Sequence, residues 1–204
     1  MKLKKLESYQ DYYDAQNGRS GMKASQINLE LIMNIFNLES EDKDISILDI
    51  GCRDATAVDF LHSKGFKNTY GFDIGERAKE TWYSTYDKAF VDSYLTVSDV
   101  HEGIPYDKEF QLILSSHVIE HLFDAPKAIE HMYKHLTQGG FLFTQVPIQP
   151  EERFLNAKPH YYMFDSMSDY ISLFDNTKFK VVHQEEGYKA ANPEATVILQ
   201  KLSI

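Results

Sequence analysis

The stretch Ile45-Ser-Ile-Leu-Asp-Ile-Gly-Cys-Arg-Asp-Ala-Thr-Ala-Val-Asp-Phe60 joins a short apolar run to an amphipathic segment through a turn at Gly51. The apolar run predicts a buried strand, and the spacing of the apolar residues after the turn predicts a helix. A helix that begins directly after a buried strand presents unpaired backbone N–H groups, which suit the anionic or polar part of a nucleotide-like cofactor. We therefore expect the cofactor at this turn.

The length and composition of the chain predict a single domain. Its 204 residues, 43% of them hydrophobic, are enough for one sizeable core and too few for two comfortable domains. We expect one domain over residues 1–204, made of a helical or flap-like N-terminal segment, 1–40, and a core, 41–204. The N-terminal segment contains a helical pattern at 27–36 and a tyrosine-rich stretch around Tyr12 that is a candidate flap.

Charge and cysteine content narrow the possible partners. Cys52 is the single cysteine, and the sequence contains no secretory signal pattern or long apolar span, so we expect a reducing cytoplasm and no membrane partner. The formal net charge of −10 would repel phosphate backbones, and the one compact basic cluster is Lys2, Lys4 and Lys5. A nucleic-acid substrate is disfavoured.

Runs typical of β-strands alternate with helical stretches along the chain. After the first strand, the predicted strands are residues 70–72, 94–97, 110–114, 141–146, 179–185 and 195–202. Because parallel strands need long crossover connections, usually helices, the alternation favours a mostly parallel α/β sheet that is covered on both faces. The last two runs are joined by a Gly/Asn/Pro loop, which predicts an antiparallel hairpin at one edge of the sheet.

The firmest helix prediction covers residues 124–136. Apolar residues recur there at helical spacing behind Asp124, a typical cap, and Pro126, which is favoured in a first turn. Gly139-Gly140 is expected to end this helix.

Four motifs in order resemble the class I S-adenosylmethionine (SAM) dependent methyltransferases that act on small molecules. They are Leu-Asp-Ile-Gly-Cys at 48–52, the acidic strand end at Asp73, Glu-His-Leu at 120–122 and Gly-Gly-Phe-Leu at 139–142. The resemblance covers roughly residues 40–200, with motif order and spacing as its specific part. It implies a doubly wound, Rossmann-like, mostly parallel seven-stranded sheet with helices on both faces and a C-terminal antiparallel hairpin, and SAM as the cofactor.

The turn departs from the family pattern at two positions, because Arg53 and Ala55 stand where the family usually has glycines. In dinucleotide-binding folds, the second glycine lets the backbone approach a pyrophosphate, whereas SAM has no phosphates. The departure therefore weighs more against an NAD-dependent oxidoreductase than against a methyltransferase. A non-catalytic Rossmann-like interaction module is the other alternative that the sequence leaves open.

Asp73 is the clearest single site prediction. It ends a short strand about twenty residues past the glycine turn, where a carboxylate can accept hydrogen bonds from both ribose hydroxyls of an adenosine. The alternative is a solvated Asp that caps the helix beginning three residues later. The resemblance further implies that Gly51, Cys52 and Arg53 in the turn, and Ile74 beside Asp73, contact SAM.

Two other acidic residues are implied to contact the cofactor. Asp99 resembles the family residue that accepts from the adenine amino group, with the backbone of Val100 beside it, although Asp is also common in loops. Asp49 would orient the turn and approach the methionine end of SAM. At a strand end it could equally be a buried structural carboxylate bonded to backbone amides.

His117-Val-Ile-Glu120-His121 spells the H-x-x-E-H pattern of a zinc protease. We reject that interpretation and expect no metal, because the segment directly follows a strand and aligns with the Glu-His-Leu segment of methyltransferases. The resemblance implies that Ser115 and His117 line the methionine half of SAM, with His117 also a candidate catalytic residue. His121 is expected to be structural.

Residues 147–164 are expected to form the acceptor pocket, because they leave the end of a central strand where open α/β sheets bind ligands. His160 is a candidate general base there. The alternative is that the loop merely covers a sheet edge with Phe154, Tyr162 and Met163 buried. The implied reaction is an in-line displacement on the sulfonium methyl of SAM by a small-molecule acceptor, for which alignment is the main requirement.

Overall fold

The structure, a computed structural model, describes residues 2–3, 22–38, 42–148, 160–189 and 192–203. The predicted flap around Tyr12 and most of the predicted acceptor loop, including Phe154, lie outside the described residues.

Seven strands form one sheet in the order β4-β3-β2-β5-β6-β9-β8. Their bounds are β2 Ile47–Ile50, β3 Thr69–Asp73, β4 Leu95–Val97, β5 Phe110–Ser116, β6 Leu136–Pro147, β8 Phe179–Lys189 and β9 Asn192–Lys201. The first five strands in this order pair in parallel, and β9 pairs antiparallel with both β6 and β8. The predicted fold class, including the C-terminal hairpin, is confirmed.

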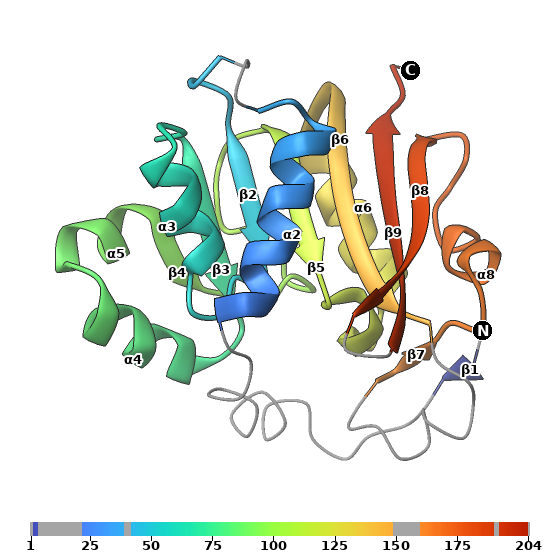
Figure 1. Ribbon diagram of the computed structural model, residues 1–204, viewed down its shortest axis with the longest axis horizontal. Coiled ribbons are helices and arrows are strands. Elements are labelled where there is room, and N and C mark those ends of the chain that lie inside the picture. Colours follow the sequence, from blue (N-terminus) through green and yellow to red (C-terminus); the bar gives the residue numbers. More distant parts are fainter. Residues whose placement is uncertain (1, 4–21, 39–41, 149–159, 190–191, 204) are drawn as a thin grey trace.

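Helices cover both faces of the sheet. Their bounds are α2 Met22–Ile35, α3 Thr56–Ser63, α4 Glu76–Thr85, α5 Lys88–Tyr94, α6 Ala125–His135 and α8 Met167–Ile171, with a 3-10 turn η1 at Ile119–His121. Figure 1 shows α2 and α3 in front of the sheet and α6 behind it. A separate antiparallel pair joins β1 (Lys2–Leu3) to β7 (Tyr162–Met163). None of the described helices is long and apolar enough to cross a membrane.

The core is split by the sheet because successive strand side chains point to opposite faces. Leu48 packs in one cluster with Ile129 of α6, whereas its neighbour Ile47 packs in another with Ile32 of α2. All four residues of β2 are buried, as expected for a central parallel strand.

Two predicted boundaries were wrong at places where one element follows another without a loop. The helix at 124–136 ends at His135, and Gly139-Gly140 does not end it but lies inside β6, which begins at Leu136. Tyr94 was predicted as strand but is the last residue of α5, so β4 begins at Leu95. In both places an element starts with no intervening loop, so there is no turn residue for sequence patterns to detect.

The chain order across the sheet reverses at β2. From β2 the chain continues to β3 and β4 on one side, and returns to β5 and β6 on the other. In open α/β sheets, ligands bind at this switch point, outside the carboxyl ends of the two flanking strands. The ends of β2 and β5 therefore mark the place to look for the site.

Candidate functional site

The turn after β2 is tightly folded around Gly51. Gly51 has φ +71°, and a Cβ placed on it would lie 2.5 Å from Cγ2 of Val118. The N–H groups of Gly51 and Cys52 donate to the Phe72 carbonyl at 2.9 and 3.1 Å, which ties the turn to the end of β3. Only glycine meets both the backbone angle and the close approach.

Arg53 and Ala55 also adopt left-handed backbone conformations, with φ of 50° and 61°. Left-handed angles favour glycine, which gives a conformational reason for glycine at these positions, and this chain adopts the angles without it. Several hydrogen bonds hold the turn: the Trp82 Nε1–H donates to the Arg53 carbonyl at 2.6 Å, and the Ala55 N–H donates to the Cys52 carbonyl at 2.7 Å. Local strain is therefore offset by tertiary contacts.

Arg53→Gly is expected to raise the free energy of unfolding by about 1 kcal/mol, because glycine adopts this φ without the left-handed penalty of other residues. Lys64→Gly is the control, since Lys64 follows α3 with φ −84°, where glycine brings no such relief. Chemical denaturation of both variants measures the effect. A loss of stability in Arg53→Gly comparable to that in Lys64→Gly would contradict the prediction.

The Asp73 carboxylate is buried, 5% exposed, and is held by the backbone of two turns. The Arg53 N–H donates to its Oδ2 at 3.0 Å and the Gly75 N–H to its Oδ1 at 2.9 Å. Burial raises the pKa of Asp73, and these two hydrogen bonds oppose that shift. Gly75 is the N-cap residue of α4, so Asp73 also supports the start of that helix. Its contact with a ribose stays a prediction.

Asp49 lies on β2 among other acidic groups. Burial, followed by repulsion from Asp73 and Asp54, raises the pKa of Asp49 to about 8. Among the described residues, no backbone amide donates to the Asp49 carboxylate, so the purely structural alternative has no support there. The Cys52 thiol is buried beside it, and burial, then the negative charge of Asp49, raises its pKa. A cation bound beside these acidic groups would favour the ionised form of Asp49 and relieve the repulsion between them.

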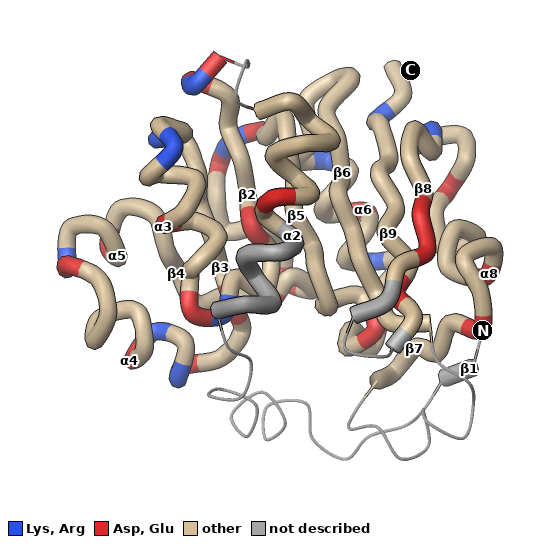
Figure 2. Tube along the Cα trace, in the orientation of Figure 1, with Lys and Arg blue, Asp and Glu red and all other residues tan. Residues whose placement is uncertain are grey.

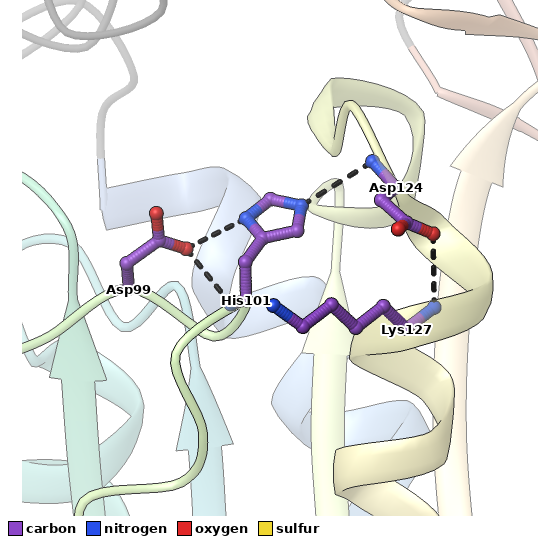
Figure 3. Close-up of polar contacts among 4 residues, drawn as sticks. All are labelled: Asp99, His101, Asp124 and Lys127. Carbon is purple, nitrogen blue, oxygen red and sulfur yellow. Dashed lines mark hydrogen bonds and ion pairs between the residues drawn. The ribbon is translucent and has the colours of Figure 1, made fainter.

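Asp99 is fixed by the residue two places after it (Figure 3). His101 donates to Asp99 Oδ1 through its backbone N–H at 2.9 Å and its Nδ1 at 2.7 Å, while the Asp124 N–H donates to His101 Nε2 at 3.4 Å. Burial raises the pKa of Asp99, but the bonds from His101 outweigh it and the net shift is downward. Phe123, 52% exposed, stacks on the His101 ring at 3.9 Å. Lys127 extends toward this group.

The other predicted contacts fall on the same edge of the sheet. Ile74 directly follows β3, and Val100, next to Asp99, is buried in the core. Ser115, near the end of β5, is fully buried, and its Oγ makes no hydrogen bond within the described part of the structure. A buried hydroxyl without a partner is a place where a ligand or water would bind.

His117 is the most strongly restrained of the predicted site residues. Its φ is 56°, its N–H donates to the Gln145 carbonyl at 2.8 Å, and its ring lies between two carboxylates. Nδ1 lies 3.3 Å from Glu120 Oε1, and Nε2 lies 3.0 Å from Glu194 Oε1 in an ion pair without hydrogen-bond alignment. Burial lowers the pKa of His117, but the two glutamates overcome this and raise it to about 9.

Glu120 is at the centre of this group. Burial opposes its ionisation, but attraction to His121 and the bond to His117 overcome burial and lower the pKa of Glu120 to about 2. The segment that contains it is the 3-10 turn η1, not the long helix of the zinc-protease pattern. His160 lies against His121, with ring centroids 4.7 Å apart, and a ring nitrogen of His160 lies within 4.8 Å of a Glu120 oxygen. The two candidate catalytic histidines, His117 and His160, therefore both lie near the Glu120 carboxylate.

Sequence reasoning missed two contributors to the site. Glu194 of β9 contacts His117, and an acidic residue directly before the apolar run of that strand was the only available signal. His101 holds Asp99, and its position two residues after an Asp is typical of a local turn, so the pattern alone did not mark it. Tyr162 and Met163 of the predicted acceptor segment are both buried. Their burial agrees with the alternative that this segment covers an edge of the sheet.

The sheet order, the glycine turn and the acidic residues at the strand ends together define a class I methyltransferase type of Rossmann-like fold. Residues 24–191 match the family described as methyltransferase domain. The chain belongs to this family, and the resemblance to SAM-dependent methyltransferases is confirmed at the level of the family. No curated protein matches its sequence.

Solved structures share the fold at low sequence identity. The N-methyltransferase NodS from Bradyrhizobium japonicum, in complex with S-adenosyl-L-homocysteine (SAH), has TM-score 0.72 and 16% identity, covering 97% of this chain and 100% of that chain. Magnesium protoporphyrin IX methyltransferase from Synechocystis, with bound SAM, has TM-score 0.70 and 12% identity, covering 97% and 98%. The 4+2 cyclase SpnF has TM-score 0.72 and 12% identity, covering 93% and 85%. The cyclase shows that the fold alone does not decide the reaction.

Proposed function

We propose that this methyltransferase-family protein transfers a methyl group from SAM to a small-molecule acceptor. The observation that carries the proposal is the Asp73 carboxylate at the end of β3, held in place by the N–H groups of Arg53 and Gly75. The carboxylate keeps acceptor capacity beyond its bonds from the backbone, so the ribose hydroxyls can bind to a group that is already oriented.

The residues at the switch point fit SAM. Asp73 would hold the ribose and Asp99, fixed by His101, would take the adenine amino group. Asp49 would face the cationic methionine end, which relieves its repulsion from neighbouring carboxylates, and the partnerless Ser115 hydroxyl would bind nearby. When bound, SAM supplies an electrophilic methyl group on a sulfonium sulfur.

The protein's own contribution would be orientation and the exclusion of water. His117 holds its proton at neutral pH because its pKa is about 9, so it supplies positive charge rather than a base. His160 keeps the predicted role of candidate base for an acceptor that must lose a proton. Its position against His121, next to the end of β5, supports that placement.

Other features support a small-molecule acceptor in a reducing cytoplasm. Lys and Arg are scattered over separate elements in Figure 2, and the net charge is −10, so a phosphate backbone is a poor partner. The single cysteine is buried. Arg53 stands where a dinucleotide pyrophosphate would approach the backbone, which disfavours NAD.

The affinity for SAM is expected to rise with pH between about 6 and 8. The Asp49 carboxyl has a pKa raised to about 8 without ligand, and a nearby cation favours its ionised form, so binding releases a proton. At a pH where Asp49 is protonated in the protein without SAM and ionised in the complex, the dissociation constant of SAM falls by up to roughly tenfold per pH unit. Calorimetric titrations at several pH values measure this slope.

Asp49→Asn is the matched control for the pH dependence. The amide has the same shape but no proton to release, so the slope should flatten. The amino group of SAM titrates near pH 8 in both experiments, and the difference between the two proteins therefore isolates Asp49. Equal slopes in the two proteins would show that Asp49 does not face the cation.

The proposed function is tested first by titrating the protein with SAM, SAH and NAD. Binding of the first two in the micromolar range, without NAD binding, is the expected result, and a screen of acceptors with labelled SAM would follow. Binding of SAM without transfer to any small molecule would contradict the acceptor class. If neither SAM nor SAH binds, the interaction-module alternative replaces the proposal.

A further inference from the structure

A histidine-carboxylate cluster lies at the end of β5, beside the site described above. One potential ligand atom from each of Glu120, His121 and His160 lies within 4.8 Å of the other two. Glu120 and His121 come from the turn η1, and His160 comes from the segment that enters β7. The Tyr161 N–H donates to the Glu120 carbonyl at 2.7 Å, and this backbone bond holds the two segments together.

The spacing of the three groups is close to that of a metal site. His121 Nε2 lies 3.8 Å from Glu120 Oε1, and the His121 and His160 rings are tilted by 75° with centroids 4.7 Å apart. Tetrahedral ligands with bonds of about 2.0–2.2 Å lie roughly 3.3–3.6 Å from one another. Small side-chain rotations, with shifts on the order of 1 Å, would bring the three atoms to that spacing.

An independent observation points to a missing partner in the same place. Glu120 is 1% exposed, and its Oε2 has no hydrogen-bond partner in the described part of the chain. Its other oxygen, Oε1, already faces His117 Nδ1 at 3.3 Å. Leaving a buried carboxylate oxygen unsatisfied is costly, and a cation bound to it would remove that cost.

We propose that Glu120, His121 and His160 bind one divalent transition-metal ion, with zinc as the first choice. Two imidazoles and one carboxylate suit zinc and its neighbours, whereas calcium and magnesium prefer sites made of oxygen ligands. Three protein ligands leave one position open, which is typical of catalytic rather than structural zinc. This set of ligands differs from the zinc-protease pattern, in which His117 and His121 would bind the metal. Here His160 takes the place of His117, and His117 contacts the ligand Glu120.

The arrangement around the cluster resembles the outer shell of known metal sites. His117 holds the Glu120 carboxylate on one side and is itself held by Glu194 at 3.0 Å on the other. Groups that orient a metal ligand in this way typically alter metal affinity by about 10–100-fold when they are removed. Glu194→Gln should therefore weaken metal binding less than loss of a ligand does.

The ion would also define the acceptor, an inference that rests on the proposed function. An acceptor hydroxyl on the open position would have a lowered pKa and release its proton to water, so that with the ion bound His160 would act as a ligand and not as the base. The acceptor oxygen would then form the O–CH₃ bond as the S–CH₃ bond breaks, with the electron pair left on sulfur to give neutral SAH. The expected acceptor class is a small molecule with a hydroxyl group able to bind a metal.

Metal binding is tested on the full chain without a histidine tag, after chelator treatment and dialysis. Calorimetric titration with Zn²⁺ should show one site per chain, and Co²⁺ should give the visible absorption of a site with nitrogen and oxygen ligands. Glu120→Gln and His160→Ala should each weaken Zn²⁺ binding at least about a hundredfold. Mg²⁺ should compete poorly.

His183→Ala is the matched control, because His183 also faces a glutamate, Glu185, at 3.4 Å but lies on the edge strand β8. Its Zn²⁺ affinity should equal that of the unmodified chain. Equal affinity in Glu120→Gln, His160→Ala and the unmodified chain, or no binding at all, would overturn the proposal. SAM titrations and thermal unfolding of each variant report cofactor binding and folding separately, so failure of the metal site is distinct from failure of the proposed function.

Discussion

Asp73→Ala is expected to weaken SAM binding by at least roughly a hundredfold. The variant loses two charge-assisted hydrogen bonds to ribose hydroxyls, each worth about 1.5–3 kcal/mol, and every 1.4 kcal/mol is tenfold in affinity. It also leaves the N–H groups of Arg53 and Gly75 without their acceptor, so the turn that meets the cofactor loosens. Calorimetric titration with SAM and SAH measures the effect.

Two further variants separate the binding role of Asp73 from its structural one. Asp73→Asn keeps the shape and one acceptor oxygen, and should fall between the unmodified chain and Asp73→Ala. Asp87→Ala removes a different capping carboxylate, which accepts from the Phe90 N–H at 2.8 Å. It should cost about 1 kcal/mol of stability while SAM affinity stays unchanged. An Asp73→Ala protein that binds SAM as tightly as the unmodified chain would disprove the ribose assignment.

Gly51→Ala is expected to lower the free energy of unfolding by about 2–5 kcal/mol. The left-handed φ of +71° costs an alanine about 1–2 kcal/mol, and the new Cβ, 2.5 Å from Val118 Cγ2, adds an overpacking cost of about 1–3 kcal/mol. Val118 follows His117, so the displacement reaches the site as well. Chemical denaturation gives the stability, and SAM titration of the folded fraction gives the effect on binding.

Two other glycines allow the two costs to be measured separately. Gly139 has a similar φ of +73°, but its nearest neighbour would be 3.9 Å from a new Cβ, so Gly139→Ala reports the backbone cost alone. Gly187 has nothing within 4 Å and no left-handed φ, so Gly187→Ala should change little. If Gly51→Ala and Gly139→Ala lose the same stability, the close approach of Val118 contributes nothing.

The part of the site that was predictable lies on contiguous segments. Gly51 follows one short buried strand and Asp73 ends another. A strand, a tight turn and a helix leave a local pattern of apolar spacing and turn residues. The parallel pairing of β2 with β3 then places the two residues at one edge of the sheet. Local patterning and one topological rule were enough for this half of the site.

The cluster around Glu120 was not predictable in the same way. Its members come from η1, from the segment before β7 and, through Glu194, from β9. No local pattern links residues so far apart in the sequence, and His160 was chosen only for its place in a loop. The H-x-x-E-H pattern suggested an arrangement on one helix, whereas the chain forms a 3-10 turn there and takes its third ligand candidate from elsewhere.

The sequence by itself determined the order of strands and helices, the fold class, the family and the turn at which the cofactor is expected, because periodicity, turn residues and motif order are properties of neighbouring residues. Only the tertiary structure decided the left-handed backbone at Arg53 and Ala55, the raised pKa of Asp49 and the assembly of Glu120 with His121 and His160. Burial and charge depend on which segments pack together, and this is settled only when the sheet closes around its core.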